Sequence, residues 1–128
     1  MSRPIKAQIM LESSDSHAGR VVNTTTSATE YSNPFSVSEG SVWSAHHVWT
    51  GTPTTAVTLW CSNYPSPSLT DDTDWVDVSP ATGMPAPAGS ASKSFLDIGN
   101  SGGAKYRFKY VTTVGSGTIK CWVHGKEV

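Results

Sequence analysis

Apolar and polar positions alternate in short runs over the second half of the chain. In residues 41–50, Trp, Ala, His and Trp occupy every second position, and the same period of two recurs in 56–63 and 105–112. Adjacent side chains of a strand point to opposite faces, so this alternation predicts strands with one buried face. The residues that share a face within each predicted strand are Trp43, Ala45, His47 and Trp49; Val57, Leu59 and Cys61; Leu96 and Ile98; Tyr106, Phe108 and Tyr110; and Ile119, Cys121 and Val123.

Turn-forming residues separate these runs. Residues 51–55 contain Gly51 and Pro53 among three Thr, and Gly, Pro, Ser or Asp dominate 64–73, 79–92 and 99–103. Short strands joined by such turns, without a convincing helix, predict an all-β fold, an antiparallel β-sandwich or jelly roll of about seven or eight strands. The predicted strands span 5–11, 41–50, 56–63, 74–78, 94–98, 105–112 and 118–124.

Two of the turns are short enough to predict hairpins. The turn at 51–55 joins two alternating strands, and the Gly-containing turn at 114–117 joins the last two. Strands connected by so few residues usually pair with each other. We therefore expect each of these turns to close a hairpin within one sheet.

Residues 12–41 are mostly polar, with Tyr31, Phe35 and Val37 as their main apolar side chains. Burial of three such side chains contributes only a few kcal/mol at ~25 cal/mol per Å². Ordering each backbone residue costs ~1–2 kcal/mol, so an ordered arm of this composition needs contacts outside its own domain. We expect Tyr31 and Phe35 to anchor the arm on a second chain.

Length, charge and hydropathy narrow the class of protein. The 128 residues fit one compact domain, and we expect 42–128 to be a β-sandwich preceded by an amino-terminal strand and extended polar arm over 1–41. The formal net charge of −1 disfavours a nucleic-acid binder driven by positive charge. No apolar run approaches the ~18 residues of a membrane span or the length of a signal peptide, so we expect neither membrane association nor classical secretion.

Charge is distributed unevenly along the chain. Residues 61–92 carry four Asp and no Lys or Arg, whereas 93–128 carry six Lys or Arg against Asp97 and Glu127. Opposite charges attract over short distances. The acidic middle and the basic end are expected to pair, either within the domain or between subunits.

Candidate chemistry is sparse. His46 and His47 are adjacent in a predicted strand, so their rings point to opposite faces and cannot easily share a metal ion. The acidic run Asp71–Asp74 lacks the Gly and distal Glu of an EF-hand loop, so we favour a solvated turn over a loop calcium site. No nucleophile elbow, phosphate loop or paired carboxylates are visible. We expect no enzymatic activity, no catalytic residue, no metal site and no cofactor.

The two cysteines allow two interpretations. Cys61, Trp75 and Cys121 are spaced tolerably for an immunoglobulin domain, but Ile119 stands where that fold has a tyrosine. A chain made in a reducing cytosol keeps its thiols free. We favour two small core residues, with a disulfide as the alternative.

Five tryptophans in a small β domain require an explanation. Trp60 and Trp122 lie opposite the apolar faces of their predicted strands. Aromatic side chains are enriched in protein interfaces, so we expect these two to cover a subunit interface. Carbohydrate binding is the alternative, and it requires exposed, roughly coplanar rings among Trp43, Trp49, Trp60, Trp75 and Trp122.

Five segments together resemble small virion proteins of tailed bacteriophages. The run Val48–Pro53 resembles their "WTGTP" turn, Val57–Asn63 their strand ending in "SN", and Asp74–Val78 a following strand that begins near a Trp. Tyr106–Tyr110 and Gly115–Thr118 are similar to their closing hairpin, "YRxxRxxY" followed by "GSGTL". The resemblance covers roughly 42–128 and departs at Cys61, where Gly or Ala is common, and in the long Pro-rich loop 79–92.

The resemblance implies a structural virion component made in the host cytoplasm. A head decoration protein that binds and stabilises the capsid exterior as an oligomer, with a trimer possible, is the leading interpretation. Its partner would be the major capsid protein or another virion protein. The alternatives are a tail, neck or fibre module and a carbohydrate-binding adhesion module. The expected interface residues are Tyr31, Phe35, Trp60 and Trp122.

Overall fold

The computed structural model of the chain describes residues 3–4, 21–24, 28–36, 42–98 and 104–127. The strand expected at 5–11 lies outside the described residues. The strands are β1 (Arg3–Pro4), β2 (Val21–Thr24), β3 (Thr29–Tyr31), β4 (Val42–Gly51), β5 (Thr54–Ser62), β6 (Val76–Asp77), β7 (Ser92–Ile98), β8 (Lys105–Val114) and β9 (Gly117–Glu127), with a short 3-10 helix η1 (Asp72–Asp74) before β6.

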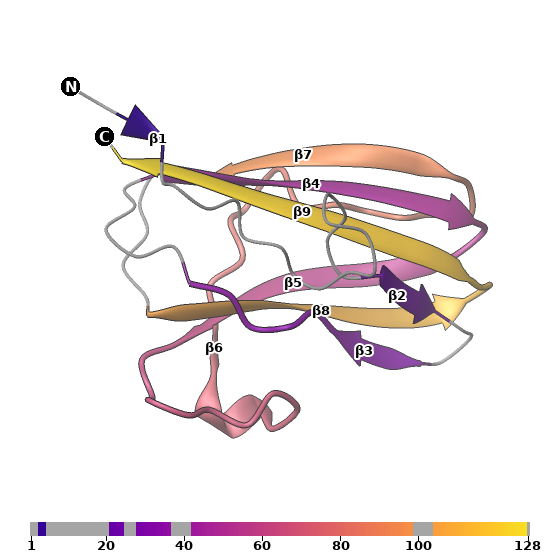
Figure 1. Cartoon of the computed structure of the whole chain (residues 1–128). Coiled ribbons are helices and arrows are strands. Elements are labelled where there is room, and N and C mark those ends of the chain that lie inside the picture. The colour runs from indigo at the N-terminus through magenta and orange to yellow at the C-terminus, as the bar shows by residue number, and fades with distance from the viewer. Residues whose placement is uncertain (1–2, 5–20, 25–27, 37–41, 99–103, 128) are drawn as a thin grey trace.

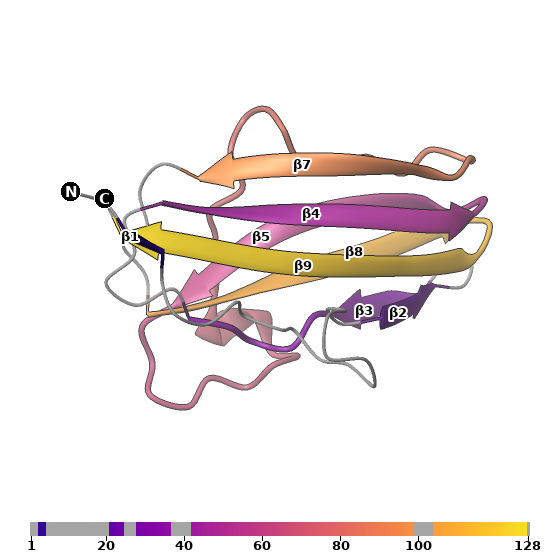
Figure 2. The same ribbon diagram turned by 45° about the horizontal axis from the view of Figure 1, so that its top comes forward.

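Two antiparallel sheets pack face to face (Figure 1). In sheet A, β9 lies between β4 and the short strands β1 and β2, and β7 forms the other edge (Figure 2). In sheet B the order is β3, β8, β5 and β6. The predicted all-β fold is therefore confirmed as a β-sandwich, with seven strands of three residues or more and two of two residues among the described elements.

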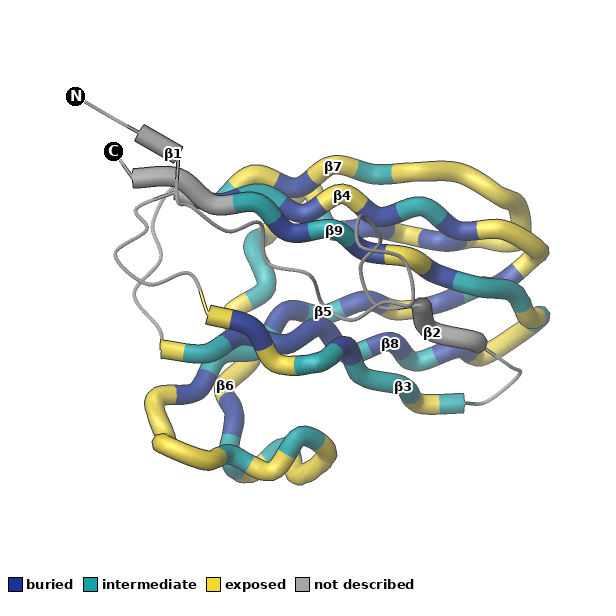
Figure 3. The backbone as a smooth tube through the Cα atoms, in the orientation of Figure 1, coloured by how far each residue is buried: buried dark blue, intermediate teal, exposed yellow. Residues whose placement is uncertain are grey.

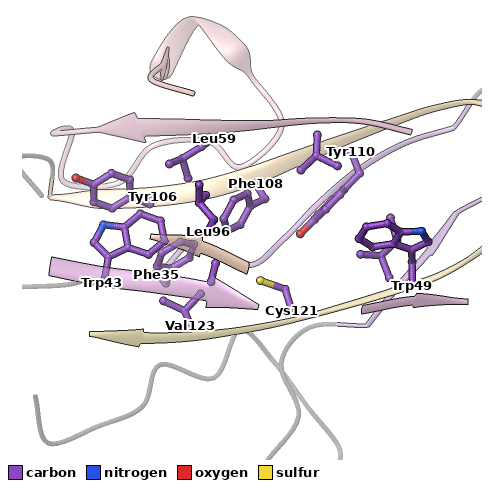
Figure 4. Packing of buried hydrophobic residues seen from close by; sticks show 13 residues of the cluster. Phe35, Trp43, Trp49, Leu59, Leu96, Tyr106, Phe108, Tyr110, Cys121 and Val123 are labelled. Carbon is purple, nitrogen blue, oxygen red and sulfur yellow. The ribbon is translucent and has the colours of Figure 1, made fainter. Parts of the chain in front are cut away.

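The alternating residues of the sequence form the core between the sheets (Figures 3 and 4). Side chains on the two inner faces interdigitate and lose their contact with water, which is the main stabilising contribution to such a fold. Cys61 and Ile98 are partly buried and pack against this cluster. The buried cluster contains Phe35, Trp43, Ala45, Trp49, Val57, Leu59, Leu96, Tyr106, Phe108, Tyr110, Ile119, Cys121 and Val123.

The two expected hairpins are wrong, because both turns carry the chain from one sheet to the other. β4 pairs with β7 and β9 in sheet A, whereas β5 pairs with β6 and β8 in sheet B. The last two strands are likewise divided, with β8 in sheet B and β9 in sheet A. Crossing the sandwich keeps both apolar faces turned toward the core, so the alternation is the same as in a hairpin.

The two crossings at 51–53 and 115–117 lie against each other at one end of the sandwich. The Thr52 amide donates a hydrogen bond to the Ser116 carbonyl oxygen at 3.0 Å. Gly115 has φ +75°, and a Cβ built on it would lie 2.0 Å from the Thr52 carbonyl oxygen. Only glycine fits so close a backbone approach in this left-handed conformation.

The described parts of the expected arm belong to the sandwich. β2 pairs with β9 at the edge of sheet A, and β3 pairs with β8 at the edge of sheet B. Phe35 follows in an antiparallel bridge to Tyr106, and its ring is 4% exposed between Trp43 and Phe108. This placement corrects the expectation that Phe35 anchors the arm on a second chain, since its ring is already buried in the core of its own chain.

The segment after β5 also differs from the expectation. The strand expected at 74–78 is reduced to β6, and η1 occupies the residues just before it. Asp71 caps η1 by accepting a hydrogen bond from the Thr73 amide, which is a common role for Asp at a helix start. No helix among the described residues is long and apolar enough to cross a membrane.

Candidate interaction surfaces

The Arg107 side chain of sheet B is enclosed by aromatic rings. It projects from β8 on the outer face of the sheet, yet its side chain is fully buried. The guanidinium carbon lies 4.6 Å from the ring centroid of Tyr31, 4.8 Å from that of Trp75 and 5.3 Å from that of Trp60. A guanidinium over aromatic faces gains a cation–π attraction that increases when water is excluded.

Asp72 and Leu69 complete the surroundings of this guanidinium. Arg107 donates hydrogen bonds to the Leu69 carbonyl oxygen and to the Asp72 carboxylate, and Lys109 donates to the other carboxylate oxygen. The hydrogen bonds from Lys109 and Arg107 hold the pKa of Asp72 below its usual value. The acidic middle and the basic end therefore pair here within the chain.

Residues 63–75, which we call the clamped loop, are held against the outer face of sheet B by these contacts (Figure 1). Further hydrogen bonds join the amino-terminal end of the loop to the start of β8, from the Lys105 ammonium to the Pro65 carbonyl oxygen and from the Ala104 amide to Asn63. The Trp75 indole donates to the Ser68 carbonyl oxygen at 2.7 Å and is 4% exposed. The loop is thus a preformed surface, with Trp75 as its floor.

The acidic residues of the clamped loop already have partners. Asp71 accepts hydrogen bonds from Thr73, and Asp74 accepts one from the Ser68 amide at 2.8 Å. With Asp72 bound to two cations, the run acts as a structural turn. Among the described residues, no group of three or more His, Cys, Asp or Glu side chains lies close enough together to hold a metal ion.

A shallow pocket of about 260 Å³ opens beside the clamped loop. Tyr64 and Val76 line it and are 56% and 64% exposed, and Val78 follows at the same edge of sheet B with 40% exposure. Exposed large apolar side chains clustered on a loop and the neighbouring strand are typical of a contact surface. The pocket is lined by Cys61, Ser62, Asn63, Tyr64, Thr73, Asp74, Trp75 and Val76.

A second exposed group lies on the outer face of sheet A. His46 of β4 pairs with Phe95 of β7 on one side and with Trp122 of β9 on the other. The ring centroids are 6.5 Å apart for His46 and Phe95, and 5.5 Å apart for His46 and Trp122. Residues directly opposite in a sheet point to the same face, so these three form one row across three strands, which we call the aromatic row.

The buried histidine has a structural role. His47 Nε2 lies 2.8 Å from the Tyr110 hydroxyl in the core, while His46 faces outward, as their adjacency predicts. Burial, and to a smaller extent the neighbouring His46, lowers the pKa of His47 to about 3. The ring is neutral near pH 7 and hydrogen-bonded inside the sandwich.

Cys61 and Cys121 are both free. Cys121 is buried in the core, and burial raises the pKa of its thiol. Cys61 is half-buried beside the pocket, and burial raises the pKa of its thiol as well. The structure thus agrees with two core-associated thiols in place of a disulfide.

The five tryptophans do not form one platform. Trp43 and Trp49 are buried in the core, and Trp75 lies under the clamped loop. Trp60 and Trp122 are half-buried on the outer faces of different sheets, and so on opposite sides of the sandwich. A sugar ring therefore cannot stack on both.

Two of the four expected interface residues meet in the structure. Tyr31 and Trp60 contact the same guanidinium on sheet B, while Trp122 lies in the aromatic row on sheet A. Arg107 and Phe95 were not among the interface residues predicted from the sequence. Arg107 lies in an alternating Lys-Arg-Lys series whose charge is opposite to that of the distant Asp-rich loop, and Phe95 faces opposite to Leu96 in its strand.

Comparison with protein families finds none that matches this chain, and a search of curated proteins finds no similar sequence.

Proposed function

We propose that this protein is a non-enzymatic structural component of a bacteriophage particle, a head decoration protein that binds the capsid exterior. The observation that carries the proposal is the surface formed by the clamped loop and the adjoining β6, which exposes Tyr64 of the loop together with Val76 and Val78 at one edge of the sandwich. A preformed loop loses little conformational freedom on binding, which favours a structural contact. The proposal of a phage particle as its location is supported by the resemblance of residues 42–128 to small virion proteins.

The proposed mechanism is repetition of a modest contact. One copy of such a small apolar surface binds weakly, since a stable interface buries roughly 1,200–2,000 Å² in total. Many copies on a symmetric shell, each touching the major capsid protein, together stiffen the shell by multivalency. The loop at 79–92 is a second candidate contact, because the Pro87 carbonyl oxygen accepts from the Thr55 amide and fixes it to the end of the sandwich.

A binding experiment with purified capsids tests the loop. The double variant Tyr64→Ser, Val76→Ser should lower co-sedimentation with capsids about tenfold or more, because it removes both large side chains of the pocket rim. The matched control is Val114→Ser, which removes an exposed apolar side chain at the far end of β8 from the clamped loop. Unchanged binding of the double variant, with the control also unchanged, would contradict the role of the clamped loop.

A particle experiment tests the decoration role itself. Phage that lack the protein should release their genome or lose shell integrity at a lower temperature than complete particles. Equal heat stability of the two particles would contradict a cement function.

A tail, neck or fibre module is the second candidate, because the same clamped loop could serve as its contact surface. The copy number in a particle map distinguishes the two roles. Hundreds of copies on the capsid faces support decoration, whereas a few copies at one vertex support a tail-associated module. An adhesion role would require glycan binding that is lost in Trp60→Ala or Trp122→Ala.

A further inference from the structure

The outer faces of the two sheets differ in how they are covered. The clamped loop covers the face of sheet B around Arg107, whereas sheet A exposes the aromatic row, with Phe95 62% exposed and His46 also exposed. Phe and Trp are enriched at protein interfaces, where burial of large rings supplies most of the affinity. We propose that the outer face of sheet A binds a second copy of this chain, row against row, about a two-fold axis that runs along the aromatic row.

Charges on both sides of the row carry this proposal. On β7, Lys93 and Asp97 flank Phe95 and are both exposed. All three point outward because side chains two apart share a face, and at ~3.3 Å per residue Lys93 and Asp97 lie roughly 13 Å apart. On β9, Lys120 is the neighbour of Trp122 at the Lys93 end of the face, and His124 is its neighbour at the other end. The face is therefore positive at one end and carries its acidic group at the other.

This pattern selects one of two packing geometries. A two-fold axis that stacks the same face of two sheets lies in the plane between them. When the strands of the two sheets are aligned, as in most face-to-face sheet packing, that axis runs either along the row or along the strands. An axis along the row places Lys93 over Asp97 of the second copy, and does so twice. An axis along the strands places Lys93 over Lys120 of the second copy, where like charges repel. Charge complementarity thus favours the axis along the row, with Phe95, His46 and Trp122 stacked at the centre.

The geometry also orients the two clamped loops. Because sheet B lies on the far side of each sandwich, the two loops end up at opposite ends of the dimer, facing away from each other (Figure 1). A dimer of this kind can bridge two binding partners. This last consequence alone rests on the proposed function, whereas the dimer itself is tested without particles.

The first test is the mass of the purified protein in solution, measured by sedimentation equilibrium over the micromolar range. The unmodified chain should be a dimer, and Phe95→Ser should be a monomer over the same range. Val114→Ser is the matched control, since Val114 is also 62% exposed but lies on β8, away from this face, and it should remain dimeric. A monomeric or trimeric unmodified chain, or a dimeric Phe95→Ser variant, would overturn the proposal.

A charge reversal tests the axis. Lys93→Glu and Asp97→Lys should each weaken dimerisation about tenfold or more, because each places like charges together twice. The double variant Lys93→Glu, Asp97→Lys should return to within about threefold of the unmodified affinity, since the pairing is restored with opposite sign. Stronger dimerisation of Lys93→Glu alone would overturn the assigned axis, because that result requires pairing with Lys120 of the second copy. Circular dichroism of each variant checks that the sandwich is folded.

Discussion

Replacing Arg107 should destabilise the sandwich although the residue lies on the outer face of a sheet. The variant Arg107→Met keeps an unbranched side chain under the clamped loop but removes the charge and the hydrogen-bond donors. It loses three cation–π contacts of about 0.5–2 kcal/mol each and two hydrogen bonds, to the Leu69 carbonyl oxygen and to Asp72. Loss of the hydrogen bond to Asp72 costs least among these interactions, because the Asp72 side chain is 38% exposed and keeps its ion pair with Lys109.

From these terms we expect the free energy of unfolding to fall by about 3 kcal/mol, well below the sum of the gross interactions because they share one side chain. For a chain of this size that corresponds to a decrease in melting temperature of roughly 12 °C. Urea denaturation followed by circular dichroism measures the free energy, and the fluorescence of Trp75 and Trp60 should report the exposure of the loop floor.

The conservative variant gives the sharper measurement. Arg107→Lys keeps the positive charge but loses the planar group that stacks between rings and donates to two acceptors, so we expect it to lose about 2 kcal/mol. The isosteric change Val114→Thr at an exposed position of β8 serves as a control and should change the stability by less than about 0.5 kcal/mol. A stability of Arg107→Lys equal to that of the unmodified protein would refute the reasoning, because a point charge would then be sufficient.

Three further predictions concern the core and the crossings. The pKa of His47 is lowered in the folded chain, so below pH 6.5 the unfolded chain binds a proton on this imidazole that the folded chain does not bind. The free energy of unfolding should therefore fall by up to about 1.4 kcal/mol per pH unit as the pH drops from about 6.5 toward 4. His47→Gln should flatten this slope in a urea titration at several pH values; an equal slope in both proteins would assign it to other groups. Gly115→Ala should cost more than about 2 kcal/mol, because the new Cβ meets the Thr52 carbonyl oxygen. Gly89→Ala, at φ +85° with open space around it, should cost about 1 kcal/mol, and equal losses would argue against the steric explanation. Finally, a thiol reagent should modify half-buried Cys61 in the native protein and Cys121 only after unfolding, which mass spectrometry of the labelled peptides can verify.

Phe35 apart, the sequence was sufficient to predict the residues of the buried cluster, because period-two alternation depends only on strand geometry. It was not sufficient to assign strands to sheets. Val57 and Trp49 would face one core whether the turn between them closed a hairpin or crossed the sandwich. The close packing of Gly115 on Thr52, which accompanies the crossing, depends on two segments distant in sequence.

The same limit explains why the burial of Arg107 and Phe35 was not predicted. Arg107 alternates with Lys105 and Lys109 as a solvent-facing residue would, and only the return of the clamped loop over the sheet buries it. Phe35 lies in a polar segment whose composition predicts an arm, but the free edge of β8 gives that segment a partner strand within its own chain. In both cases contacts between distant segments override the local pattern.

The position of β9 has a consequence for how the chain folds. Every described strand that pairs with it precedes it by many residues, as in the pairing of Val22 with Ile119. Loops that long close slowly, so we expect folding in milliseconds to seconds, at the slow end for a domain of this size. During synthesis at about 5–20 residues per second, β4 waits roughly 4–15 s for β9 to be made. Throughout this interval β4, which carries Trp43 and Trp49 on its inner face, lacks that partner strand. A chaperone that binds exposed aromatic residues should therefore raise the yield of folded protein, whereas slower translation should lower it by lengthening the interval.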